Sequence, residues 1–162
     1  MKNLTLEHNS TKPTVHIIAD DFTSAADAAA SFARRGLSSI VCRDDIYPRE
    51  TNAVDLVSLD TGSRLLSVPR AVSIMEDTLS ELLSDLTGST GGLLIKTVDS
   101  PLRGNVREEL TAVINLVLNS NFYDRVIIAP AFPKAGRITE KGVQYVNGER
   151  VAQSPYGKDP VH

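Results

Sequence analysis

The sequence predicts an α/β fold: a mainly parallel sheet flanked by helices on both faces, with a C-terminal β-hairpin. Short apolar, β-branched runs alternate along the chain with segments whose apolar residues recur at helical spacing. The strand-like runs lack the alternation of apolar and polar residues that marks a sheet with one face in water, so helices should cover both faces. Asn147-Gly148, flanked by alternating residues, is a strong hairpin signal.

The first half of the chain supplies three strands and two helices. Short β-branched runs predict the strands at 15–19, 38–42 and 53–59. An alanine-rich helix over 24–35 is expected between the first two strands, because it closes on two arginines and is followed by Gly36. A second helix, over 69–86, is indicated by apolar residues that fall on one face.

The second half adds two strands, a helix and the hairpin. Apolar runs predict strands at 91–98 and 124–130. Asn105 is expected to cap the intervening helix, with Glu108 reaching back in a variant of the capping box. The hairpin occupies 142–152. In terms of domains, we expect a polar lead-in at 1–14, one α/β domain over 15–153, and the start of a linker to an absent second domain at 154–162.

Composition narrows the class of protein. The chain has 162 residues and a formal net charge of -3, which argues against a nucleic-acid surface. A single cysteine, Cys42, cannot form an internal disulfide, and no apolar run is long enough to span a bilayer. We therefore expect a cytoplasmic protein without membrane contact. The histidines and Cys42 show no metal-ligand spacing, so no metal site is expected.

Polar and charged side chains follow the predicted strands. In open parallel sheets, ligands bind beyond the carboxyl ends of the strands, so these side chains should line one pocket. The candidates are Asp20, Asp21, Arg64, Lys96, Asp99, Ser100, Arg103 and Arg137. Arginine binds carboxylates through two hydrogen bonds, and aspartate accepts hydrogen bonds from hydroxyls or takes a proton. The set suits a small polyhydroxylated acid.

Structural roles compete with this interpretation. The Asp20-Asp21 pair could equally form a turn and helix cap, and Arg64 and Arg137 could be surface ion pairs. A lysine in an apolar strand, such as Lys96, is harder to explain by packing. Neither a GxxxxGK[ST] loop nor a GxGxxG after the first strand is present, so we expect no cofactor-binding residues for ATP in this chain.

Five blocks resemble the four-carbon acid sugar kinase family, in its N-terminal, substrate-binding domain. They are IADDFTSAAD (18–27), DTGSR (60–64), KTVDSPLRGN (96–105), PAFPKAGR (130–137) and YVNG (145–148). The resemblance implies an ATP-dependent kinase of two α/β domains that phosphorylates threonate, erythronate or a related acid. It also implies that ATP and Mg²⁺ bind mainly to the absent C-terminal domain, so this chain alone should be inactive.

The matched motifs imply roles for the candidate residues. Asp20 or Asp21 would meet the substrate hydroxyls and act as the catalytic base, and Arg64 would hold the acid. The rest of the ligand pocket would be lined by Lys96, Asp99, Ser100 and Arg103. The motif gives weaker support for assigning Arg137 to this pocket. The chain departs from the family pattern at Ser24, where glycine is usual, and at Pro101, which replaces a threonine.

Other functions remain open at this point. A receiver-type signalling domain also places paired acids after its first strand, a phosphorylated aspartate (here Asp60) after the third, and a lysine later in the chain. Against it, receivers have little use for the arginines, and Thr97 rather than proline follows Lys96. A stand-alone binding module is the third candidate. The expected partners are a small sugar acid and the ATP-binding domain, and the sequence leaves homo-oligomers open.

Overall fold

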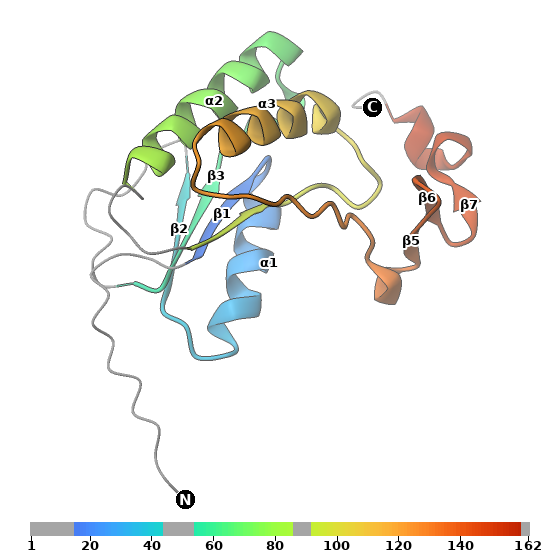
Figure 1. Cartoon of the computed structure of the whole chain (residues 1–162). Helices are drawn as coiled ribbons and strands as arrows, with labels where there is room; N and C mark the ends of the chain where they lie inside the picture. Colours follow the sequence, from blue (N-terminus) through green and yellow to red (C-terminus); the bar gives the residue numbers. More distant parts are fainter. Residues whose placement is uncertain (1–14, 44–53, 86–91, 160–162) are drawn as a thin grey trace, which may run out of the picture.

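The computed structural model describes residues 15–43, 54–85 and 92–159 (Figure 1). Four strands form a wholly parallel sheet in the order β2-β3-β1-β4. They are β1 (Val15–Ala19), β2 (Ser39–Arg43), β3 (Leu56–Asp60) and β4 (Leu93–Lys96). The first predicted strand is confirmed at both ends, and the next three are confirmed with shifted ends. Positions outside the described residues are 53 and 91 of those strands, position 86 of the second predicted helix, the predicted lead-in at 1–14 and linker positions 160–162.

Helices cover both faces of this sheet, as predicted. Figure 1 shows α1 (Phe22–Ala33) on one face and α2 (Val68–Asp85) with α3 (Val106–Asn119) on the other. Alternate β1 side chains fill the two cores: Ile17 packs with α1, and Ile18 packs with α2 and α3, both with no exposed surface. No helix in the described segments is long and apolar enough to cross a bilayer.

The predicted C-terminal hairpin is confirmed within a small antiparallel sheet. It contains β5 (Arg137–Glu140), β6 (Val143–Val146) and β7 (Glu149–Arg150). Asn147 and Gly148 have φ of 51° and 85°, which is the left-handed pair that a two-residue hairpin turn needs. The strand β5 was not predicted, although Lys141-Gly142 forms a second turn of the same kind.

The predicted strand over 124–130 is wrong. This stretch pairs with no strand of the described sheet, and Ile127 and Ile128 are 89% and 61% exposed. Figure 1 shows it leaving α3 as an extended trace that runs to β5. A β-branched run favours extended backbone, but a strand also needs a neighbour and a packed face, which the local sequence does not reveal.

Candidate functional site

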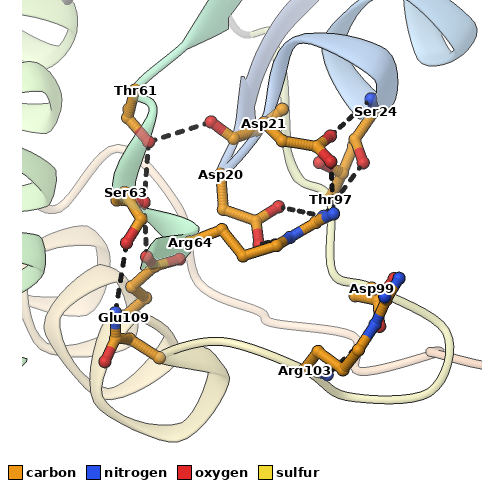
Figure 2. A network of polar contacts seen from close by, with 12 residues as sticks. Asp20, Asp21, Ser24, Thr61, Ser63, Arg64, Thr97, Asp99, Arg103 and Glu109 are labelled. Atoms are coloured by element: carbon orange, nitrogen blue, oxygen red, sulfur yellow. Dashed lines mark hydrogen bonds and ion pairs between the residues drawn. The ribbon is translucent and has the colours of Figure 1, made fainter. Parts of the chain in front are cut away.

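The carboxyl ends of β1, β3 and β4 meet at one edge of the sheet. From neighbouring β1 and β3, the chain continues to helices on opposite faces, α1 and α2 (Figure 1). Open α/β sheets bind ligands where neighbouring connections diverge in this way. Five of the predicted residues gather here, and we call them the acid–arginine rim: Asp20, Asp21, Arg64, Asp99 and Arg103 (Figure 2).

Arg64 is held by the two aspartates that follow β1. Its Nε and Nη2 donate to the two carboxylate oxygens of Asp20 at 2.8 and 2.9 Å, and Nη1 donates to Asp21 (Figure 2). Burial lowers the pKa of this guanidinium, but the hydrogen bond and charge of Asp20, with the nearby carboxylates, outweigh it and raise the pKa overall. Arg64 therefore stays charged and tightly paired.

The two aspartates differ in exposure. The side chain of Asp20 is 3% exposed, and that of Asp21 is 30% exposed. Asp21 is also the N-cap of α1, where its Oδ1 accepts from the backbone N–H of Ser24 at 2.7 Å. Asp21 thus caps a helix, as the structural interpretation expects, and its carboxylate is still partly exposed; a role of the pair in a ligand site stays a prediction.

The loop after β4 carries the second ion pair of the rim. Arg103 donates from Nε and Nη2 to the two oxygens of Asp99, each at 2.9 Å, and its backbone N–H donates to the same carboxylate. Burial raises the pKa of Asp99, but these hydrogen bonds and the Arg103 charge lower it overall. The pKa of Arg103 rises, chiefly through the hydrogen bond from its side chain to Asp99. Its side chain is 31% exposed.

This loop packs directly on Arg64. Gly104 has φ of 84°, and a Cβ atom there would lie 3.1 Å from Arg64 Cγ. Asn105 occupies the N-cap of α3, but its side chain makes no capping bond, so the predicted capping box is wrong. Its amide instead donates to the carbonyls of Ser63 and Leu66 at 3.1 and 3.0 Å, which ties α3 to the turn that bears Arg64.

Lys96 points into the interior. Its side chain is 5% exposed, and Nζ lies 2.9 Å from Oε2 of Glu109, whose side chain is 2% exposed. Nζ also donates to the carbonyl of Thr97. Glu109 was not singled out in the sequence, although an acid on the apolar face of the predicted helix was a signal for it. Its Oε1 accepts from Ser63 at 2.5 Å.

The two remaining candidates lie beside the rim. Arg137 donates to the hydroxyl of Tyr156 at 3.2 Å, and the guanidinium carbons of Arg103 and Arg137 each lie 5.9 Å from the Tyr156 ring centre. The carbonyl of Ser100 accepts from Gln144. Tyr156 belongs to a 3₁₀ turn, η4 (Pro155–Lys158), at the start of the expected linker. The aromatic contact joins Arg137 to the rim through Arg103.

The structure does not favour a receiver domain. Asp60 is only 5% exposed, and its Oδ1 accepts from the backbone N–H of Gly62 at 2.9 Å. The described residues contain no group of three or more His, Cys, Asp or Glu side chains placed to hold a metal ion.

Family comparison identifies the domain. Residues 15–162 match the model of a family described as the sugar-binding N-terminal domain. The chain belongs to this family. The match includes every residue of the acid–arginine rim and confirms the resemblance noted in the sequence.

Curated relatives of this sugar-binding N-terminal domain are kinases of four-carbon acids. It is 30% identical over 144 residues to a D-threonate kinase of Salmonella typhimurium, and 29% identical over 150 residues to a D-erythronate kinase of Heliobacterium modesticaldum. These alignments cover 89% and 90% of this chain but 32% of each relative. The chain spans about a third of the length of the curated relatives it matches.

Solved structures support the fold. A Bordetella bronchiseptica domain, described as a domain-swapped dimer with bound citrate, superposes with a TM-score of 0.77 at 27% identity. That match covers 93% of this chain and 37% of the other. A Haemophilus influenzae protein gives a TM-score of 0.70 at 25% identity over 90% of this chain and 34% of its own.

Proposed function

We propose that this domain binds the sugar acid in an ATP-dependent kinase that phosphorylates a four-carbon acid such as threonate or erythronate. The observation that carries the proposal is the acid–arginine rim at the carboxyl edge of the parallel sheet. The names of the kinase relatives and the citrate bound to the Bordetella domain support a small carboxylate as ligand.

The two arginines of the rim have different roles in this proposal. Arg64 is 15% exposed and already paired with two carboxylates, so it organises Asp20 and Asp21 around the ligand. Arg103 is more exposed, and its Nη1 lies 3.7 Å from a carboxylate oxygen of Asp159, which is longer than a hydrogen bond. Arg103 is therefore the better-placed anchor for the ligand carboxylate, with Asp99 holding the guanidinium in orientation.

The exposed carboxylate of Asp21 is the proposed base. A general base must lie within hydrogen-bond reach of the proton that it takes, and Asp21 is the more accessible member of the pair. Asp20, locked by two hydrogen bonds to Arg64, would accept a hydrogen bond from a substrate hydroxyl. Phosphoryl transfer depends mainly on positioning and on charge stabilisation, which is what such a rim provides.

Three further residues take supporting roles. Ser100 and Arg137 would complete the wall around the ligand, Arg137 through its shared contact with Tyr156. Lys96 is assigned to the buried pair with Glu109 instead of to the ligand, because its ammonium group is enclosed and already has two acceptors.

ATP and Mg²⁺ are proposed to bind mainly outside the region that this chain represents. The kinase relatives extend well beyond the matched third of their length. Phosphoryl transfer requires a nucleotide and normally Mg²⁺. In that arrangement the chain alone binds the acid without turning it over. The coding sequence beyond His162 separates this proposal from a stand-alone binding module, which would lack a nucleotide-binding half.

Calorimetric titration with D-threonate tests the proposal. We expect saturable binding that weakens about tenfold or more in Arg103→Ala, because a hydrogen bond to a charged group is worth ~1.5–3 kcal/mol. Arg107→Ala is the matched control, since that arginine is exposed on α3. Equal affinity in the two variants would contradict the assigned anchor. Phosphorylation of D-threonate by this chain with ATP and Mg²⁺ would contradict the division of labour.

Self-association and location complete the proposal. Edge strand β4 and the exposed residues Val126, Ile127 and Ile128 offer surfaces for a second copy, and the Bordetella domain is described as a domain-swapped dimer. Light scattering should show a dimer that Ile127→Lys weakens. A monomer at high concentration would refute the association.

The cytoplasm remains the proposed location because one cysteine suits a reducing compartment.

A further inference from the structure

We propose that Glu109 is a positioning residue for Arg64, acting through Ser63 as a buried hydrogen-bond acceptor. Lys96 has the separate role of neutralising the carboxylate. The position of Arg64 can be measured without a ligand. Only the expected effect on ligand affinity rests on the proposed function.

Glu109 reaches the turn that bears Arg64 from a different element. It lies on α3, is 1% exposed, and accepts at Oε1 from the hydroxyl of Ser63 at 2.5 Å. Ser63 has no exposed surface and immediately precedes Arg64 in the short turn η1 (Ser63–Leu65). A buried hydroxyl and a buried carboxylate both need partners, so this bond fixes where the turn lies against α3.

A second side chain of α3 holds the same turn. Asn105 is one helical turn before Glu109, and its amide donates to the carbonyls of Ser63 and Leu66, on either side of Arg64. The backbone N–H of Arg64 in turn donates to the carbonyl of Asp20 at 3.1 Å. The start of α3 therefore sets the position from which Arg64 reaches the aspartates.

The network continues towards β1. The hydroxyls of Thr61 and Ser63 lie 2.9 Å apart (Figure 2), and because Ser63 donates its proton to Glu109, Thr61 is the donor in this pair. The backbone N–H of Thr61 donates at 2.9 Å to the carbonyl of Ala19, the last residue of β1 before the aspartates. Through Glu109, Ser63 and Thr61, one line of hydrogen bonds joins α3 to the strand end that presents Asp20. The same hydrogen-bond network therefore positions both Arg64 and its partner Asp20.

The charge of Glu109 has a separable role. Oε2 faces Lys96 at 2.9 Å, and this pair keeps a buried carboxylate from being uncompensated. The hydrogen bond from Ser63 goes to the other oxygen of Glu109, Oε1, and needs only an acceptor there, not a charge. A glutamine in place of Glu109 can supply that acceptor, provided that Lys96 is also replaced by a neutral side chain of similar length.

The decisive measurement is the exchange with water of the Arg64 Nε–H, followed by NMR in the ligand-free chain and assigned with Arg64→Lys. Ser63→Ala removes the donor and leaves the Lys96–Glu109 pair intact. We expect exchange about tenfold faster, the factor given by loss of one net hydrogen bond. Ser80→Ala is the control, because it removes an exposed serine hydroxyl on α2. Unchanged exchange in folded Ser63→Ala would overturn the proposal.

Two double variants separate acceptor from charge. K96M/E109Q should restore slow exchange relative to K96M/E109L, which lacks any acceptor for Ser63. Equal exchange in these two folded variants would also overturn the proposal, and if K96M/E109L does not fold, Ser63→Ala decides. The two proposals can fail separately. If the wild type does not bind D-threonate but exchange of the Arg64 Nε–H still becomes faster in Ser63→Ala, the proposed function is refuted and the positioning role stands.

Discussion

Replacement of Gly104 by alanine should disturb the acid–arginine rim through contact with Arg64. The added Cβ would lie 3.1 Å from Arg64 Cγ and 3.3 Å from Arg64 O, and the second of these atoms belongs to the backbone and cannot rotate away. The left-handed backbone, φ 84°, costs alanine ~1–2 kcal/mol, and crowding adds ~1–3 kcal/mol. We expect a stability loss of about 2–5 kcal/mol and acid affinity lowered about tenfold.

Gly36→Ala separates the two contributions. Gly36 has a similar φ of 93°, but a Cβ there would meet no atom within 4 Å. Urea unfolding should therefore show a loss of only ~1–2 kcal/mol for Gly36→Ala, and calorimetry should show unchanged D-threonate affinity. If Gly104→Ala costs no more stability than Gly36→Ala and binds the acid equally well, the contact with Arg64 has no role in the site.

Three further predictions concern the second ion pair of the rim and its neighbour. Arg103→Lys retains the charge but loses the two-point bond to Asp99. Calorimetry should therefore show about tenfold weaker D-threonate binding, with little change in the free energy of unfolding. Equal affinity would argue against two-point anchoring. The pKa of Asp99 is lower in the folded chain, so its stabilising contribution is present above its ordinary pKa and is lost as the pH falls through the folded value. Asp99→Asn should therefore cost stability in urea at neutral pH and less at about pH 2.5, and a cost independent of pH would exclude that role. Tyr156→Leu should weaken binding more than Tyr156→Phe, which keeps the ring beside Arg103 and loses only the bond to Arg137; the reverse order would show that the hydroxyl matters more.

The parallel sheet could be predicted from the sequence because its two central strands, β1 and β3, are buried on both faces. A continuous run such as Val15–Ala19, with no residue exposed to water, is typical of a parallel strand that helices cover on both faces. The residues that follow these runs were then placed at one edge by topology alone, which is why Asp20, Arg64 and Arg103 could be brought together in advance.

The failures arose where tertiary contacts compete with local preference. The β-branched run at 124–130 was predicted as a strand, but in the described structure no neighbouring strand pairs with it. Asn105 is a residue type that commonly caps a helix through its side chain. Its amide instead donates to the carbonyls of Ser63 and Leu66, more than thirty residues away in the chain. The enclosure of Lys96 beside Glu109 was also not predicted, because only the packing of α3 brings the two side chains together; a role of Lys96 at the site stays a prediction.

The central claim is that the acid–arginine rim binds a small hydroxylated carboxylate. A crystal structure of the chain soaked with D-threonate tests it most directly. We predict density for the acid at the carboxyl edge of β1, β3 and β4, with its carboxylate on Arg103 and a hydroxyl within hydrogen-bond distance of Asp21. Density for the acid only elsewhere, such as along α2, would contradict the claim.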